Sequence, residues 1–250
     1  MRSPRRCSLT IKQIFILSLV IYALLWASLP IFIRHCLPLD VMEGTTWAHH
    51  WQWGYDKDPY LNALLTRFAL WLGQGSDAVL YGFSPLMIGL AAISLWRLFT
   101  RMFSPTMALF SIAALASCQY YNIASVDFND NVVLIALWAI AIERFHAALV
   151  LGQLWRWLML GVVCGLGLMA KYSFVFLLLS FLVFYCLPVV RKQRPRIGVL
   201  LLAILAGGLV CLPHIVWLWH NDFVTIRYVI YRGRSHHRLL SHFYFPLKFL

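Results

Sequence analysis

The sequence predicts an all-α protein that crosses a membrane about seven times. Three observations predict this fold class: a strongly apolar composition, a series of apolar runs of spanning length, and an uneven distribution of basic residues between the connecting segments. Hydrophobic residues make up 62% of the 250 residues, charged residues only 12%, and the mean hydropathy is +0.75. A soluble domain of this length does not need so much apolar surface, so we expect the chain to reside in a membrane.

Seven apolar segments approach the length of about 20 residues that a spanning helix needs. We expect them at residues 14–33, 78–98, 105–121, 131–148, 154–170, 173–190 and 197–218. The first segment follows a basic N-terminus, as the apolar part of a signal peptide does. It is long enough to span, however, and no small-residue cleavage site follows it, so we interpret it as an uncleaved helix.

Residues 34–77 are expected to form a long outer loop between the first two spans, and residues 1–250 a single transmembrane domain. Within the loop, residues 61–72 are apolar but too short to span. They predict a short amphipathic helix in the membrane interface, with Arg67 facing the headgroups. The tryptophan and tyrosine residues of the loop fit an interfacial aromatic belt.

Basic residues predict a cytoplasmic N-terminus. The segments that would then face inward hold most of the arginine and lysine residues, whereas the short outer loops hold few, as the positive-inside rule requires. Of the nine acidic residues, only Glu143 would lie on the inner side. The tail at 221–250 breaks this pattern with five basic residues and ends in an aromatic stretch. Either the chain is the N-terminal part of a longer protein, or the tail is a peripheral basic segment.

Composition and motifs exclude several functions. The net charge of +12 follows from this topology and not from nucleic-acid binding, because no basic stripe lies on a soluble domain. The six cysteines include no CxxC pair, which argues against a zinc site or a disulfide framework. The absence of GxxxxGKS, HExxH and GxSxG motifs argues against a nucleotide-driven pump, a zinc protease and an α/β-hydrolase.

The first outer loop gathers four of the nine acidic residues: Asp40, Glu43, Asp56 and Asp58. Asp40 and Glu43 are three residues apart, so they would share one face of a helical turn. Lys57 lies between two aspartates on a segment that glycine and proline hold non-helical, and its ammonium group suits a phosphate. The alternative is that these are ordinary solvated charges of a loop.

Two further polar segments are expected on the same side of the membrane. Lys171 interrupts an apolar run between the fifth and sixth spans, where it either snorkels to the headgroups or forms a second phosphate contact. The segment ASVDFNDN, residues 124–131, precedes the fourth span. There Asp130 or Asn131 either caps that helix or the segment supplies a second acidic group that orients a substrate or shares a metal ion.

Histidines and glycines give weaker signals. His49 and His50, and likewise His236 and His237, offer a metal or sugar contact, but adjacent histidines point to different sides of a helix. Close helix packing is the expected role of four glycines: Gly152, Gly161, Gly165 and Gly167.

Together these residues resemble the GT-C glycosyltransferases that use a polyprenyl-phosphate sugar. The resemblance rests on LDVMEG at residues 39–44, WQWGYDKDP at 51–59, the second acidic motif, AKYS at 170–173 and LPHIVW at 212–217. Within these enzymes the chain is most similar to the bacterial family 39-like group, which includes relatives of the lipid A aminoarabinose transferases and protein mannosyltransferases.

The resemblance implies an integral enzyme of the bacterial inner membrane whose active site faces the periplasm. Its implied partners are a polyprenyl-phosphate-linked sugar donor, a glycolipid or protein acceptor, and membrane lipids, with no nucleic acid. The implied catalytic residues are Asp40, Glu43 and Asp130. The implied substrate- and phosphate-binding residues are Lys57, Lys171, Tyr55, Tyr172 and Asp127.

In this scheme Asp40 is the general base that takes a proton from the acceptor. Lys57 and Lys171 stabilise the charge on the lipid phosphate as it leaves. A lipid-linked sugar donor explains why no nucleotide-binding motif is needed. A divalent metal ion held by Asp40 and Asp130 is a candidate cofactor.

The chain also departs from the family pattern. Relatives commonly carry Lys-His-Pro-Pro where this chain has Lys57, Asp58, Pro59 and Tyr60, and they continue through further helices with an outer C-terminal region. A transporter or flippase, or an inactive truncated remnant, are the alternatives. The gathering of charges on one face favours surface catalysis over a transporter, whose helices often break at mid-membrane.

Overall fold

The structure is a computed structural model that describes residues 9–233. The basic N-terminal residues, the end of the basic tail, and His236 and His237 lie outside the described residues. Between residues 9 and 233 every regular element is helical, and the one strand-like pairing is an isolated antiparallel bridge between Gly54 and Pro59. The predicted all-α fold class is therefore confirmed for this part of the chain.

Ten α-helices and four short 3-10 helices follow one another along residues 9–233. The α-helices are α1 (Ile11–Ile33), α2 (Leu39–His49), α3 (Leu61–Leu72), α4 (Ala78–Met102), α5 (Pro105–Ala116), α6 (Asp130–Leu151), α7 (Leu154–Ala170), α8 (Val175–Cys186), α9 (Ile197–His220) and α10 (Val224–Gly233). The 3-10 helices are η1 (Gln119–Tyr121), η2 (Ile123–Val126), η3 (Tyr172–Phe174) and η4 (Pro188–Gln193).

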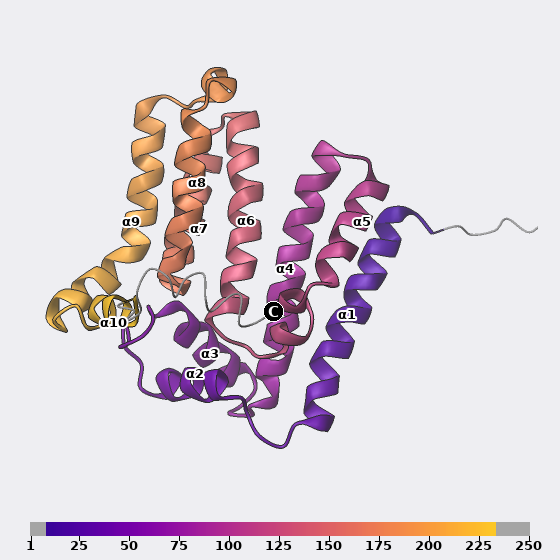
Figure 1. Cartoon of the computed structure of the whole chain (residues 1–250), viewed down its shortest axis with the longest axis vertical. Coiled ribbons are helices and arrows are strands. Elements are labelled where there is room, and N and C mark those ends of the chain that lie inside the picture. The colour runs from indigo at the N-terminus through magenta and orange to yellow at the C-terminus, as the bar shows by residue number, and fades with distance from the viewer. Residues whose placement is uncertain (1–8, 234–250) are drawn as a thin grey trace, which may run out of the picture.

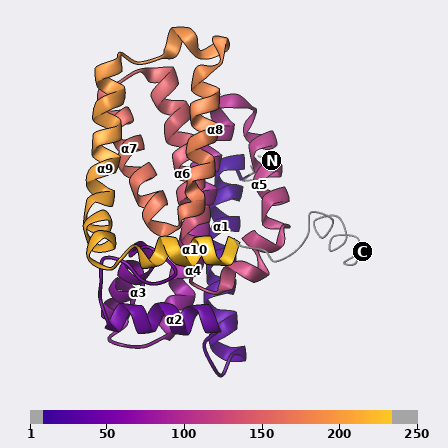
Figure 2. The ribbon, with the colours of Figure 1, turned by 60° about the vertical axis from the view of Figure 1, so that its left-hand side comes forward.

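The helices divide into a bundle and a group that covers one end of it. Figure 1 shows α1 and α4 to α9 running up and down beside one another. The shorter helices α2, α3 and α10 lie across the lower end of this bundle, and Figure 2 shows the same arrangement from a second direction. This lower end is where the first outer loop and the start of the tail come together.

Among the described residues, four helices are long and apolar enough to cross a membrane: α1, α4, α6 and α9. A fifth candidate counts if α5 and the segment Gln119–Val126 form one broken span, bent by 97°. α7 and α8 have only 17 and 12 residues. The structure thus supports an all-α membrane protein but does not confirm seven spanning helices.

Most of the predicted segments agree with the observed helices. α7 has the predicted bounds, and α4, α6 and α9 extend beyond them by a few residues. α1 begins earlier than predicted because Thr10 and Gln13 form a capping box, in which each side chain accepts from the backbone N–H of the other residue.

The third predicted span, residues 105–121, is wrong in its last five residues. α5 ends at Ala116, and the chain then bends sharply into η1 and η2. The hydroxyl of Tyr22 in α1 donates to the backbone carbonyl of Tyr121 at 2.8 Å. A neighbouring helix therefore satisfies backbone groups that a straight helix would have paired internally.

The sixth predicted span, residues 173–190, is also too long. α8 ends at Cys186, because Leu187 precedes Pro188 and is held extended, with ψ at 141°. Proline disfavours the helical conformation of the residue before it and has no N–H of its own. Arg194 then donates to three backbone carbonyls at the end of α8.

The predicted interfacial segment forms α3 with the predicted bounds. Its buried side includes Ala63 and Ala69, which are fully covered, and Arg67 is exposed as predicted. Phe68 and Trp71 are exposed as well, so apolar side chains lie on both sides of the helix. The helix packs beside α2 under the lower end of the bundle.

Three of the four glycines let α7 pack closely against its neighbours, as predicted, and two of them lie at the contact with α9. A Cβ added to Gly161 would run into the backbone carbonyl of Ala203, and one added to Gly165 would lie 2.6 Å from the carbonyl oxygen of Gly207. Gly167 packs in the same way against the ring of Phe174. Small residues allow such backbone contact between membrane helices.

The fourth position, Gly152, has a different role. It has a φ of 62°, caps the C-terminus of α6, and faces open space. The left-handed conformation at this position explains the glycine, because other residues adopt it at a cost.

Gly161→Ala is expected to lower the free energy of unfolding by about 1–3 kcal/mol, because the new methyl group would overpack the contact between α7 and α9. Gly208→Ala on α9 is the matched control, since nothing lies within 4 Å of its added Cβ. The control should be neutral or slightly stabilising, because alanine favours helix over glycine. Thermal unfolding in detergent compares the two variants, and equal stability would contradict this packing.

Candidate active site

A cavity of about 620 Å³ lies at the end of the bundle where α2 and α10 are found. Six of the eight sequence-predicted site residues line it: Asp40, Glu43, Lys57, Asp130, Lys171 and Tyr172. These residues come from α2, the following loop, α6 and the junction between α7 and α8. Segments far apart in the chain therefore meet at one polar cavity.

The helix α2 carries the first two carboxylates. It starts directly after Pro38, which is extended, and Asp40 lies in its first turn, where a negative charge is favourable beside the helix N-terminus. Asp40 and Glu43 both line the cavity, as their spacing predicts, and Trp47 extends the same wall. The other face of α2 is buried through small residues.

A tight turn presents Lys57 and Asp58 to the cavity. Gly54 and Pro59 form the bridge at its base, and the backbone N–H of Tyr55 donates to the carbonyl of Asp58 at 3.0 Å. The ammonium group of Lys57 donates to Oε1 of Glu43 at 2.5 Å. This hydrogen bond is the main cause that raises the pKa of Lys57 above its ordinary value.

His214 of α9 fixes this turn. Its Nδ1 lies 2.7 Å from the backbone carbonyl of Trp53, which can only accept, so Nδ1 carries the proton. Nε2 then accepts a hydrogen bond from the hydroxyl of Tyr172 at 2.5 Å. Trp217 stacks on His214 and donates through its indole N–H to Gln52.

A second ion pair lies on the cavity wall formed by α6. Lys171 Nζ lies 2.5 Å from Oδ2 of Asp130 and donates to Oδ1 of Asn131 at 2.6 Å. The cap of α6 is neither of these residues but Asn129, whose side chain accepts from two backbone N–H groups of the first turn. Asp130 and Asn131 therefore hold Lys171 at the cavity wall. A lysine that snorkels to the headgroups would make neither of these contacts.

The helix α10 adds residues that the sequence had placed in a basic tail. Tyr228, Val229 and Arg232 line the cavity. The buried hydroxyl of Thr225 donates to the backbone carbonyl of Tyr55 at 2.5 Å and attaches α10 to the turn. The sequence of α10 carries no motif, so its position beside the cavity is visible only in the structure.

Two sequence-predicted residues lie outside the cavity wall. Tyr55 is buried beneath it, stacks on Trp47 and donates through its hydroxyl to the carbonyl of Trp47. Asp127 forms an ion pair with Arg34 at the end of α1. Tyr55 supports the cavity from below, and Asp127 joins α1 to the segment before α6. His49 and His50 are exposed and do not line the cavity either.

Sequence reasoning did not assign two residues of the first loop and α3 to the site. Asp58 was noted only as a charge that departs from the family pattern, yet it lines the cavity. Asn62 also lines it, is 2% exposed, and has an Oδ1 without a hydrogen-bond partner among the described residues. A buried amide oxygen without a partner is uncommon and fits a cavity that binds a polar ligand.

Asp58 has the most altered acid–base behaviour at the site. Burial, followed by the negative charge of Asp130, raises the pKa of Asp58 to about 7, against the opposing effect of Lys171. Glu43 and Lys57 also act on Asp58, in opposite directions. The carboxyl group therefore lies between the two ion pairs and changes charge near neutral pH.

The candidate metal ligands Asp40 and Asp130 line the same cavity. Asp130 is engaged by Lys171, and residues 9–233 contain no group of three or more His, Cys, Asp or Glu side chains that could hold a metal ion. The divalent cofactor stays a prediction.

Comparison with known proteins connects this cavity to a family. Residues 57–217 match the family of dolichyl-phosphate-mannose-protein mannosyltransferases, and the matched segment includes Lys57, Asp130 and Lys171. It covers more than half of the chain. The chain belongs to this family. The resemblance to GT-C glycosyltransferases that the motifs indicate is thereby confirmed.

This member of the mannosyltransferase family is also similar to a protein of Pseudomonas aeruginosa (strain LESB58), an undecaprenyl phosphate-alpha-4-amino-4-deoxy-L-arabinose arabinosyl transferase. The two are 34% identical over 145 residues, which is 55% of this chain and 25% of the relative. The chain therefore spans about a quarter of the relative's length in this match. No solved structure matches the chain significantly.

Asp58→Asn is expected to flatten the dependence of stability on pH. The pKa of Asp58 is raised to about 7, whereas an unfolded aspartate titrates near pH 3.9. Between these values the folded protein holds a proton that the unfolded chain has released, so stability falls as the pH rises through this window. Asparagine cannot titrate, so the variant should exceed the parent in stability above about pH 7.

Thermal unfolding in detergent between about pH 4 and pH 8, a range that includes the window from about 3.9 to about 7, measures this effect. Asp56→Asn is the matched control, because Asp56 is the exposed neighbour outside the cavity. The control should keep the parent profile. A parent-like pH profile in Asp58→Asn would contradict the assigned pKa.

Proposed function

We propose that this chain belongs to a glycosyltransferase that moves a sugar from a polyprenyl-phosphate donor to a lipid or protein acceptor at the outer face of the membrane. The observation that carries the proposal is the common cavity of Lys57, Lys171 and Asp40 at one end of an apolar helix bundle. Family membership and the name of the Pseudomonas relative support a lipid-phosphate sugar donor.

The two lysines supply the phosphate site. Each is already held by a carboxylate, Lys57 by Glu43 and Lys171 by Asp130, and both ammonium groups line the cavity. Their side chains stay about one third exposed, so a phosphate can approach them. Arg232 on α10 lines the same cavity and adds a third positive charge. Fixed cations of this kind stabilise the charge that develops on a leaving phosphate.

Asp40 is the proposed general base. It is exposed, lines the cavity, and makes no side-chain hydrogen bond or ion pair within residues 9–233. The acceptor hydroxyl oxygen would attack the anomeric carbon of the sugar while the bond from that carbon to the phosphate oxygen breaks. The proton of the hydroxyl passes to Asp40, and the bonding electrons leave with the polyprenyl phosphate. A single displacement of this kind inverts the anomeric carbon.

The charge distribution supports the proposed orientation. The carboxylates of the cavity lie at one end of the bundle, whereas the arginines at the ends of α4 and α6 lie at the other. The positive-inside rule would then direct the cavity outward. A lipid-linked sugar donor could reach it from the membrane with its prenyl chain among the apolar helices.

Asp40→Asn is expected to lower sugar transfer in membranes by on the order of 10²–10⁴-fold, because the acceptor would lose its proton acceptor. Expression and thermal stability should stay close to those of the parent. Asp56→Asn, in the same loop but outside the cavity, should keep its activity. Transfer from a polyprenyl-phosphate sugar is measured, with the full-length protein in membranes. Parent-like transfer by Asp40→Asn would remove Asp40 from the mechanism.

Lys57→Ala and Lys171→Ala are each expected to lower transfer by on the order of 10²-fold. Other enzymes lose about this much activity when one group that stabilises developing charge is removed. Arg67→Ala is the control, because Arg67 is exposed on α3 and does not line the cavity. Initial rates are compared across concentrations of the sugar donor. Solute uptake without a sugar donor would instead support a transporter, and full activity of both lysine variants would contradict the phosphate site.

A further inference from the structure

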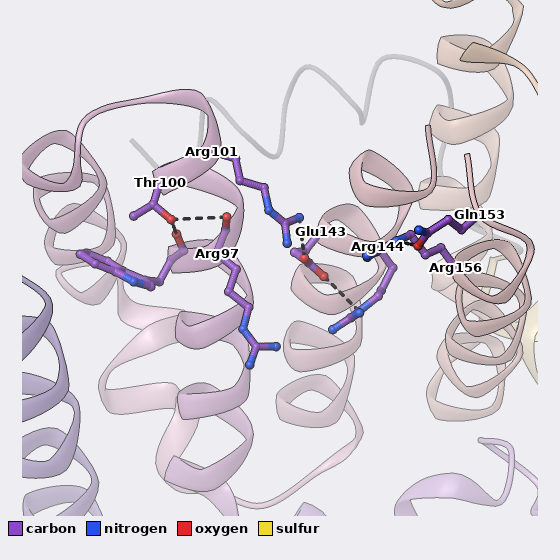
Figure 3. A network of polar contacts seen from close by, with 8 residues as sticks. Arg97, Thr100, Arg101, Glu143, Arg144, Gln153 and Arg156 are labelled. Carbon is purple, nitrogen blue, oxygen red and sulfur yellow. Dashed lines mark hydrogen bonds and ion pairs between the residues drawn. The ribbon is translucent and has the colours of Figure 1, made fainter. Parts of the chain in front are cut away.

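The end of the bundle opposite the cavity holds a buried carboxylate with two arginines. Glu143 of α6 is 1% exposed. Its Oε1 accepts from Nη1 of Arg101 at 2.8 Å, and its Oε2 lies 3.0 Å from Nε of Arg144. Figure 3 shows Arg101 reaching from α4 to this carboxylate. One carboxylate therefore orients two guanidinium groups, since each of its oxygens contacts one of them.

The guanidinium groups exceed the carboxylate in charge and in hydrogen-bonding capacity. Each guanidinium has five N–H donors, and Arg101 and Arg144 each contact Glu143 through one nitrogen atom. Arg97 lies one helical turn before Arg101 and makes no side-chain hydrogen bond or ion pair within the described part of the chain. Figure 3 shows it extending from α4 toward α6. Two of the three guanidinium groups thus pair with one carboxylate, and Arg97 adds a positive charge without an ion pair among the described residues.

Aromatic residues indicate that these arginines lie at the depth of the lipid headgroups. Trp96, beside Arg97, stacks on Phe15 of α1 with ring centroids 4.4 Å apart. Trp155, at the start of α7, lies under the guanidinium of Arg156. Tryptophans are enriched at the boundary between the membrane and water, and basic pockets between membrane helices at this depth bind anionic headgroups.

We propose that Arg97, Arg101 and Arg144 bind the phosphate of an anionic glycerophospholipid. Glu143 positions two of the guanidinium groups and leaves their remaining N–H donors for the phosphate oxygens. Arginine suits this ligand, because its planar fork matches phosphate geometry. Arg97 and Arg101 are exposed on α4, and the neighbouring Trp96 at the expected headgroup depth favours a lipid phosphate over a soluble one. This site does not depend on the proposed transferase reaction.

Retention of phosphatidylglycerol tests the proposal. The full-length protein is placed in nanodiscs of phosphatidylcholine with and without phosphatidylglycerol, extracted in mild detergent, and weighed with its bound lipid by native mass spectrometry. Arg97→Gln should weaken retention of phosphatidylglycerol about fivefold, because it removes a charge-assisted contact to the phosphate that is worth about 1 kcal/mol. Arg97→Lys should recover most of this loss, because it restores the charge.

Arg156→Gln is the matched control. Arg156 lies at the same end of the bundle, stacks on Trp155 and donates to Gln153, so its removal lowers the net charge equally. The control should retain the lipid as the parent does. Retention that is unchanged in Arg97→Gln, or lost equally in Arg156→Gln, would overturn the site. Displacement of the lipid by inorganic phosphate at equal concentration would overturn its assignment to a lipid.

Discussion

The turn between Gly54 and Pro59 can lie against α9 only because Gly54 has no side chain. A Cβ at this position would run into the rings of His214 and Trp217. The bridge from Gly54 to Pro59 and the hydrogen bond from Tyr55 to Asp58 depend on that close approach. Any larger residue would push the turn away from α9 and carry Lys57 with it. The geometry of the cavity therefore depends on one backbone contact between segments about 160 residues apart.

His214 connects the two lysine-bearing segments through that same contact. On one side of its ring it donates to the backbone of Trp53, and on the other it accepts from Tyr172, which follows Lys171 in the chain. The ring thus connects the two backbone segments that carry Lys57 and Lys171, while Glu43 and Asp130 hold the ammonium groups. The proposed phosphate site would benefit from this arrangement, because fixed groups do not have to reorganise when charge develops.

The sequence predicted the helices, and the charged residues that lie at the cavity, better than it predicted which residues those charges pair with. Asp40 and Glu43 share a wall because helix periodicity is local, and α3 has its predicted bounds for the same reason. The pairing of Lys57 with Glu43 depends on a turn docked against α9, which no local pattern encodes. α5 ends earlier than predicted, and Tyr22 of α1 forms a hydrogen bond with the segment that follows it. From the sequence, α10 was predicted only as part of a basic tail. In the structure Thr225 attaches this helix to the turn, and Arg232 lines the cavity.

The ion pairs at the two ends of the bundle differ in how much they contribute to stability. The pairs of Lys57 and Lys171 leave both lysines about one third exposed, so each adds only about 0–1 kcal/mol to stability. Under the proposed function, opening these pairs for a phosphate would therefore cost little. The carboxylate of Glu143 is almost fully buried, so loss of its arginine partners would leave an uncompensated buried charge, at a larger cost than at the cavity. Arg101 and Arg144 are thus held by a buried carboxylate, whereas the proposed phosphate site requires the lysines of the cavity to exchange a carboxylate for a ligand.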